Sequence, residues 1–248
     1  MKNKKIIPTF LILFVLSVLL YTNRLSVKRV MARSYYQLQA VILSLATDKE
    51  LRVRLDVPFH RQERALSCEI ATLRMALNYY GLRVSETELL AKLPFETNSS
   101  RLLGNIWGDP DVGFVGNING RMPNSGYGVY EDPIALIANQ YREAKALRGT
   151  TLATILQEVA SGRPVIVWGY ISSGKDISWQ TPEGKQIKAV YGEHTRVVTG
   201  FYGSISDPKY LIMLDPIYGR VIWPANKFLK NWATPFPSQY LRNISSGV

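Results

Sequence analysis

The chain holds one cysteine, Cys68, at a position where its thiol could act as a nucleophile. Cys68 follows Gln62 by six residues and opens a segment whose apolar residues recur at helical spacing. Backbone N–H groups at a helix N-terminus favour a thiolate, so we expect the helix to lower the pKa of this cysteine. The Gln62 amide and the Cys68 backbone N–H could stabilise the oxyanion of an attacked carbonyl. This arrangement indicates acyl transfer, and the alternative is a buried, inert cysteine.

A nucleophilic thiol needs a base, and the chain has two histidines. His194 precedes one apolar, β-branched segment, and Asp215 ends the next. If residues 195–202 pair with residues 209–214 in a hairpin, the start of one strand lies beside the end of the other. His194 would then meet Asp215, which could orient the imidazole as a general base. His60 lies nearer in sequence to the thiol and is the rival base, on a predicted loop.

The order of the predicted elements indicates an α+β fold. One helix is predicted from Cys68 to Gly81, and a second begins with the capping-box pattern at Ser85. Short apolar strands are predicted later in the chain, over residues 164–171, 195–202, 209–215 and 219–224. Helices followed by strands favour a helical layer on an antiparallel sheet, with a cleft between the two layers.

Residues 97–133 form a long glycine-rich segment between the predicted helices. Long loops in compact domains are usually functional or disordered, and the aromatic residues here favour an ordered segment that lines a cleft. Its acidic and amide residues include Asp109 and Asp111, but they lack the spacing of an EF-hand calcium loop. We therefore interpret them as turn formers and expect no metal.

The charge is concentrated near the N-terminus. The net charge is +11, yet residues 1–55 hold ten of the 30 Lys and Arg residues and two of the 19 acidic residues. The remainder is nearly balanced and has no basic run, so we expect no nucleic-acid partner. A single cysteine also rules out an intramolecular disulfide.

The N-terminal segment resembles a targeting or anchoring sequence. Three lysines precede an apolar run over residues 6–21, and no clear cleavage site follows. We expect residues 1–25 to be a membrane anchor or signal segment and residues 26–50 a juxtamembrane linker or helix. Residues 51–248 are expected to form a single domain. The basic N-terminus predicts an extracytoplasmic domain, secreted if the segment is cleaved.

The site residues resemble family 39 of the cysteine peptidases, the bacteriocin-processing peptidases of the papain-like clan. The resemblance rests on Gln62 with Cys68, on His194 leading the sequence Val-Val-Thr-Gly-Phe, and on Asp215 followed by proline. It covers about residues 55–223. The segment GFVGNING with GYGVYEDPIA is more similar to the stand-alone branch, which has no transporter domain.

This resemblance implies a papain-like fold, a peptide or protein substrate, and no cofactor or metal. It also implies that Cys68 is the nucleophile, His194 the general base and acid, Asp215 the orienting residue and Gln62 the oxyanion donor. The chain departs from the family at Glu69, where members often have glycine, and a carboxylate beside the thiol would raise its pKa.

Two alternatives to peptide hydrolysis stay open. An acyl or amide transferase shares the first half of the reaction, because an amine replaces water only in the second half. A peptide-binding module on an inactive peptidase fold would use residues 97–133 as a clamp. Without a transporter domain there is no reason to expect a double-glycine leader as the substrate.

Overall fold

The computed structural model of the protein describes residues 27–42, 51–97, 101–102, 104–233 and 243–246. Residues 27–42 form a helix. The later helices are α2 (Cys68–Tyr79), α3 (Glu86–Leu90), α4 (Glu131–Ala138), α5 (Leu152–Ala160) and α6 (Ala225–Ala233). Ser85 caps α3 by accepting a hydrogen bond from the Glu88 backbone N–H, as the capping-box pattern predicts.

Most strands form a seven-stranded sheet in the order β10-β9-β8-β5-β11-β4, with β1 paired to β8. Its strands are β1 (Leu51–Arg54), β4 (Ala144–Ala146), β5 (Val165–Tyr170), β8 (Glu193–Gly203), β9 (Pro208–Asp215), β10 (Gly219–Pro224) and β11 (Asn243–Ser246). All its pairs are antiparallel. Two smaller sheets pair β2 (Phe95–Thr97) with β3 (Phe114–Val115) and β6 (Asp176–Gln180) with β7 (Gln186–Val190).

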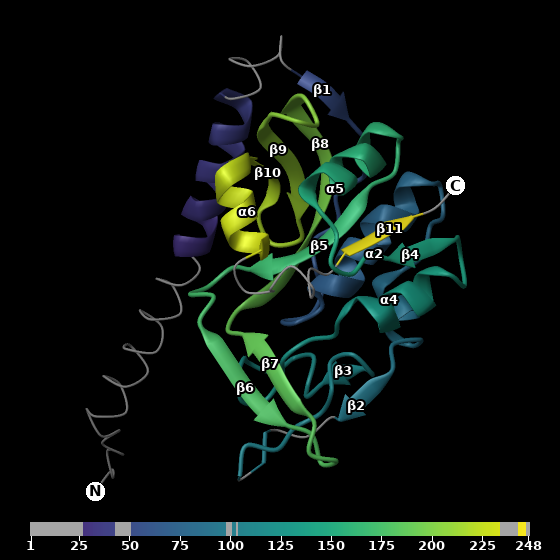
Figure 1. Cartoon of the computed structure of the whole chain (residues 1–248), viewed down its shortest axis with the longest axis vertical. Helices are drawn as coiled ribbons and strands as arrows, with labels where there is room; N and C mark the ends of the chain where they lie inside the picture. Colours follow the sequence, from purple (N-terminus) through teal and green to yellow (C-terminus); the bar gives the residue numbers. More distant parts are fainter. Residues whose placement is uncertain (1–26, 43–50, 98–100, 103, 234–242, 247–248) are drawn as a thin grey trace, which may run out of the picture.

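Helices cover the large sheet on both sides. Helix α6 and the helix of residues 27–42 lie on one side in Figure 1, and α2, α4 and α5 lie on the other, while the β6–β7 hairpin extends away from the sheet. Strand β8 is buried along almost its whole length, because it lies between β5 and β9 and is covered on both faces.

The α+β arrangement predicted from the order of the elements is confirmed. The predicted hairpin is also present, since Val197 pairs with Leu214 and Phe201 pairs with Leu211. This register places the beginning of β8 near the end of β9, which is the feature that positions the candidate site.

The glycine-rich segment does not line a cleft with its aromatic residues, so that expectation is wrong. Trp107 and Tyr127 are buried, and their ring centroids lie 5.4 and 5.0 Å from that of Trp179 in β6. Because edge-to-face contacts of this kind stabilise apolar cores, these residues attach the segment to the β6–β7 hairpin.

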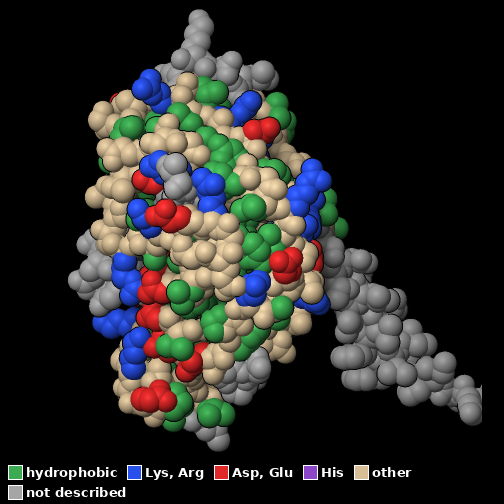
Figure 2. Space-filling view, turned by 90° about the vertical axis from the view of Figure 1, so that its right-hand side faces the viewer, with side chains coloured by type: hydrophobic (Ala, Val, Ile, Leu, Met, Phe, Trp, Pro, Cys, Tyr) green, Lys and Arg blue, Asp and Glu red, His purple; other side chains and the backbone are tan. Residues whose placement is uncertain are grey.

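The acidic residues of the same segment form ion pairs. Lys185 Nζ lies 2.6 Å from Asp109 Oδ2 and 3.2 Å from Asp111 Oδ2. Figure 2 likewise shows Lys and Arg side chains interleaved with Asp and Glu on one face of the molecule. Basic and acidic side chains are thus interspersed in the part of the chain after residue 55, as its nearly balanced composition predicts.

The membrane prediction is corrected by the structure. In the described part of the chain, no helix is both long and apolar enough to cross a bilayer. This finding contradicts the predicted transmembrane helix, the membrane partner and the membrane-anchored location. The predicted anchor itself, residues 1–25, lies outside the described residues.

Candidate active site

Cys68 is the first residue of α2 and is only 4% exposed. Its thiol donates a hydrogen bond to Glu69 Oε2 at 3.2 Å. Glu69 Oε1 accepts a hydrogen bond of 2.9 Å from the Val129 backbone N–H. A Cβ atom at Gly128 would lie 2.6 Å from Glu69 Oε1 and 2.7 Å from Glu193 Oε2, so both carboxylates converge on this glycine. The thiol therefore lies in a buried, acidic environment.

This environment reverses the expected effect of the helix N-terminus. Burial raises the pKa of the Cys68 thiol well above its usual value, and the charges of Glu69 and Glu193 raise it further, although the Thr195 backbone N–H lowers it. Burial also raises the pKa of Glu69 to about 7, since its backbone hydrogen bonds offset the desolvation only in part. The predicted influence of Glu69 has the expected sign, whereas the predicted lowering of the thiol pKa is not found.

His194 and Asp215 lie together at the adjoining ends of β8 and β9. The His194 Nε2 atom lies 3.2 Å from Asp215 Oδ1, and the two side chains are 2% and 0% exposed. This contact holds the imidazole against the carboxylate, and it becomes a charged pair only when His194 is protonated. Burial lowers the pKa of His194 despite the opposing charge of Asp215, which favours the neutral imidazole that a base requires.

Asp215 is held rigidly. Its Oδ1 accepts hydrogen bonds from the backbone N–H groups of Ile217 and Tyr218, at 2.8 and 3.0 Å. Burial alone would raise its pKa, but the charges of His194 and Arg196 and these hydrogen bonds hold the pKa well below its usual range. The carboxylate is therefore ionised and fixed in direction.

Arg196 is a site residue that the sequence reasoning missed. Its Nε donates to Asp215 Oδ2 at 2.9 Å, and its guanidinium stacks 4.5 Å from the centroid of the Trp223 ring. It also donates to Asn231 of α6 at 3.2 Å. A signal was present in the sequence, because Arg196 stands two residues after His194 and so shares its face of the predicted strand.

The thiol and the imidazole are not hydrogen-bonded to each other within the described residues. Glu193 and Thr195 face α2, where Thr195 Oγ1 lies 3.1 Å from Thr72 Oγ1, whereas His194 faces Asp215. The structure thus brings two groups to neighbouring residues of β8: the thiol with its carboxylates, and the imidazole with Asp215 and Arg196.

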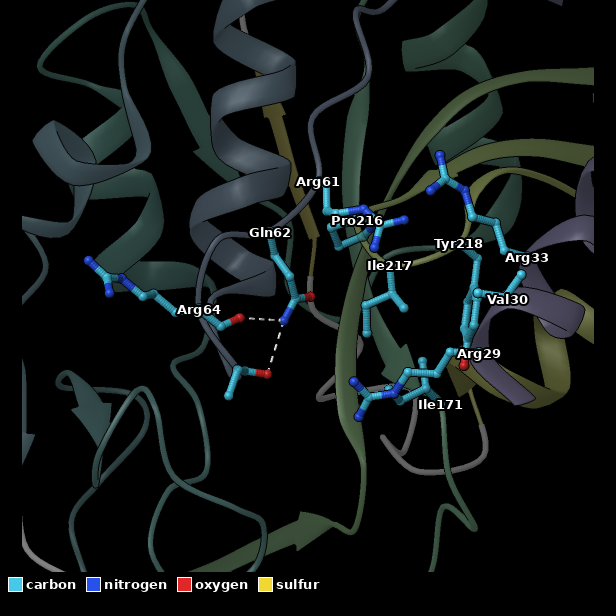
Figure 3. Close-up of a pocket in the computed structure, with 11 residues that line it drawn as sticks. Arg29, Val30, Arg33, Arg61, Gln62, Arg64, Ile171, Pro216, Ile217 and Tyr218 are labelled. Carbon is cyan, nitrogen blue, oxygen red and sulfur yellow. Dashed lines mark hydrogen bonds between the residues drawn. The ribbon is translucent and has the colours of Figure 1, made fainter. Parts of the chain in front are cut away.

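Gln62 lies beside the turn that follows Asp215. Its backbone N–H donates to the Pro216 carbonyl at 3.1 Å. Its side-chain Nε2 donates to the carbonyls of Arg64 and Ala65, at 2.8 and 3.0 Å (Figure 3). Both N–H bonds of the amide are used by its own loop, so oxyanion binding would require the side chain to rotate.

His60 belongs to a different cluster. Its Nε2 lies 2.8 Å from Glu86 Oε2, and Arg74 Nη1 lies 2.9 Å from the ring nitrogens. His60, Glu63 and Glu86 could supply three metal ligands, but the Arg74 guanidinium also lies 3.2 Å from Glu63 and already supplies a cation there. The geometry does not bring the rival base to the thiol.

A model of the Peptidase C39-like family matches residues 54–235. The uncharacterized protein YvpB of Bacillus subtilis is 32% identical over 238 residues, covering 87% of this chain and 89% of that protein. A crystal structure named as a C39-like peptidase from Bacillus anthracis has a TM-score of 0.67 at 27% identity, covering 80% of this chain and 98% of the other. A double-glycine motif protease of an AMS/PCAT transporter, solved with its leader peptide, has a TM-score of 0.46 at 19% identity, covering 79% of this chain and 96% of the other.

The chain belongs to the Peptidase C39-like family. The resemblance and the fold expected from it are confirmed. Family and fold support a papain-like, peptidase-related function.

Proposed function

We propose that the protein is a cysteine peptidase that hydrolyses peptide bonds through Cys68, His194 and Asp215, with Gln62 as the oxyanion donor. The observation that carries this proposal is the buried contact of His194 with Asp215, at 3.2 Å, on strand β8, whose next residue, Thr195, contacts Thr72 of the thiol-bearing helix α2. Membership in a peptidase-like family supports it.

The chemistry begins with the transfer of the thiol proton to the neutral imidazole of His194. The thiolate then attacks the peptide carbonyl, and the Gln62 amide and the Cys68 backbone N–H stabilise the oxyanion. The imidazolium next protonates the leaving amine, and a thioester remains on Cys68. Water, deprotonated by His194, hydrolyses the thioester and restores the thiol. Asp215 stabilises the imidazolium and fixes its orientation throughout.

The proposed reaction needs a preparatory rearrangement. The thiol donates a hydrogen bond to Glu69 and must leave this acceptor, and the His194 ring, which faces Asp215, must come within reach of the thiol before the proton can move. Since the Cys68 side chain has a single rotatable bond before the sulfur, a change of rotamer is the simplest way to move it. If substrate binding favours the new rotamer of Cys68, then binding the substrate would also activate the thiol.

A second candidate is a peptide-binding module on an inactive peptidase fold. The observation in its favour is the buried thiol, whose pKa is raised well above its usual value by burial and by two carboxylates. Such a thiol is a poor nucleophile in the arrangement described.

The deciding experiment compares the full chain with Cys68→Ala, His194→Ala and the control His60→Gln. Each is incubated with a fluorescence-quenched peptide mixture, and the protein is inspected by intact mass spectrometry for a peptidyl thioester. We expect turnover and an acyl-enzyme in the wild type and in His60→Gln, and neither in Cys68→Ala or His194→Ala. Peptide binding that survives Cys68→Ala, with no thioester in the wild type, would favour the binding module.

A further inference from the structure

An open cavity of about 580 Å³ adjoins the candidate active site. One wall is the loop that carries Gln62, and another is the turn of residues 216–218 directly after Asp215. A third wall comes from Arg29, Val30 and Arg33 of the helix of residues 27–42 (Figure 3). A ligand in the cavity would therefore lie next to Gln62 and to the turn whose backbone N–H groups bind Asp215.

The cavity is strongly cationic. Its lining includes Arg29, Arg33, Arg61 and Arg64 and no acidic residue. Figure 3 shows Arg29, Arg33 and Arg61 around the turn of residues 216–218, whereas Arg64 extends to the other side of Gln62. None of the four guanidinium groups forms a salt bridge with a carboxylate of the described chain. Other arginines of the described chain have carboxylate partners, among them Arg74, Arg148, Arg163 and Arg196.

The helical wall of the cavity is attached to the sheet. The Tyr36 ring lies 5.4 Å from that of Tyr218, and Lys227 Nζ lies 5.5 Å from the Tyr36 centroid. Ala40 of the same helix is buried in a cluster with Ile212 and Ile222. This helix lies outside residues 54–235, so Arg29 and Arg33 are contributed by a segment beyond the family match.

We propose that this cavity binds a carboxylate of the peptide substrate beside the cleaved bond, so that the preferred substrates are acidic peptides. The inference rests on the proposed function. The planar guanidinium presents several N–H donors that match a carboxylate, and neighbouring guanidinium groups without counter-ions gain from a shared anion. The carboxylate could belong to an Asp or Glu side chain or to a peptide C-terminus, since the chemistry is the same.

A binding experiment separates these sources. The full chain with Cys68→Ala is titrated into dye-labelled peptide mixtures in which one position is fixed as Asp, Glu, Asn or Gln, with free or amidated C-termini. Fluorescence anisotropy gives the affinity of each mixture. We expect about tenfold tighter binding of the carboxylate-bearing member of a matched pair, because charge-assisted hydrogen bonds are stronger than those to a neutral amide. A preference at the fixed position identifies a side-chain carboxylate, and a preference for free C-termini identifies the terminal one.

Arginine variants locate the effect. Arg29→Gln with Arg61→Gln should remove the preference for carboxylates, whereas Arg52→Gln, an exposed position on β1 outside the cavity, should keep it. In a catalytically intact chain, the double variant should raise KM for acidic peptides and leave kcat nearly unchanged, as expected for lost ground-state binding.

The outcomes distinguish this inference from the proposed function. Equal affinity for acid and amide peptides, or equal losses in the cavity variants and in Arg52→Gln, would overturn the inference. Turnover of neutral peptides with the same KM as acidic ones would overturn it while the peptidase stands. Arginine-dependent binding of acidic peptides without any turnover would support the cavity and refute the peptidase.

Discussion

At the scale of single residues, the Asp215 carboxylate contacts two side chains, those of His194 and Arg196. One carboxylate oxygen faces the His194 imidazole and two backbone N–H groups, and the other accepts a hydrogen bond from the buried Arg196. The residue that orients the proposed base therefore also neutralises a cation inside the fold. A substitution at this position should affect both catalysis and stability.

We expect Asp215→Asn to lower kcat by about 100-fold or more, because the amide stabilises the wrong imidazole tautomer. It should also reduce the free energy of unfolding by about 3–5 kcal/mol, since Arg196 is left buried without a counter-charge. Peptide turnover and denaturant unfolding measure the two effects. The control is Asp207→Asn, an exposed partner of Lys209, which should change neither. Unchanged stability of Asp215→Asn would contradict this account.

Glu69 should make stability depend on pH. Burial raises its pKa to about 7 from 4.5, so the folded state holds the proton more tightly than the unfolded state. Its stabilising contribution is complete below about pH 4.5 and is lost as the pH rises through 7. Removing it with Glu69→Gln should flatten the unfolding free energy over this range, by up to about 3 kcal/mol. Denaturant midpoints at several pH values test this; a slope equal to that of the wild type would refute it.

The same carboxylate should control the reactivity of the thiol. Glu69→Gln removes one of the charges that raise the pKa of Cys68, so the pH midpoint of alkylation by iodoacetamide should move downward. The exposed residue Glu88 on α3 offers a control, because Glu88→Gln should leave the midpoint where it is. An unchanged or higher midpoint in Glu69→Gln would contradict this account, because both the charge of Glu69 and its hydrogen bond raise the pKa of the thiol.

At the scale of elements, α3 positions the loop that leads into α2. The Glu86 side chain is fully buried, accepts hydrogen bonds from the Glu63 backbone N–H and the Ser67 hydroxyl, and lies beside His60. One carboxylate thus fixes both ends of the segment that carries Gln62.

Truncation of this carboxylate should loosen the segment. Glu86→Ala leaves the buried Ser67 hydroxyl and the half-buried Glu63 backbone N–H without this acceptor, so we expect the free energy of unfolding to fall by about 2–4 kcal/mol. Glu88→Ala, on the exposed side of the same helix, should cost less than about 0.5 kcal/mol. Chemical denaturation compares the two variants, and similar losses would show that the Glu86 contacts contribute little.

The sequence predicts those elements whose signals are local. The periodic residues after Cys68, the Ser85 cap and the two strands that bring His194 to Asp215 can all be read within short windows. Contacts between residues that are distant in sequence cannot be predicted in this way. The bond of Glu69 to the Val129 backbone and the burial of Trp107 against Trp179 arise only when separate elements pack together.

For the same reason, the sequence predicts only part of the environment that raises the pKa of the thiol. Glu69 is adjacent to Cys68 and its effect could be anticipated, but Glu193 reaches the thiol from a strand more than a hundred residues later. Burial, the largest influence on this pKa, depends on the complete fold.

At the scale of the whole molecule, the sheet is completed by β11, which lies between β5 and β4. Its backbone pairs with Ile166 and Val167 of β5 on one side and with β4 on the other. In Figure 1 this strand lies across the helical side of the molecule near α2 and β4. A central strand needs its backbone N–H groups for the ladder.

We therefore expect Ile244→Pro to be strongly destabilising. Proline removes a backbone donor from a strand that is paired on both sides, at a cost of about 3 kcal/mol or more. Ile244→Val keeps the donor and the β-branched side chain, so it should be tolerated. Thermal unfolding of both variants measures the difference, and equal melting temperatures would show that the strand is dispensable.

The position of β11 also bears on how the protein is made. During synthesis, β5 emerges from the ribosome long before residues 243–246 do. Until then, one edge of the apolar strand Val-Ile-Val-Trp-Gly-Tyr has no partner. An open apolar edge readily pairs with other chains. Expression yield should therefore depend on chaperones that shield this edge. Proteolysis before residue 243 would expose the same edge in the folded protein and make it prone to aggregation.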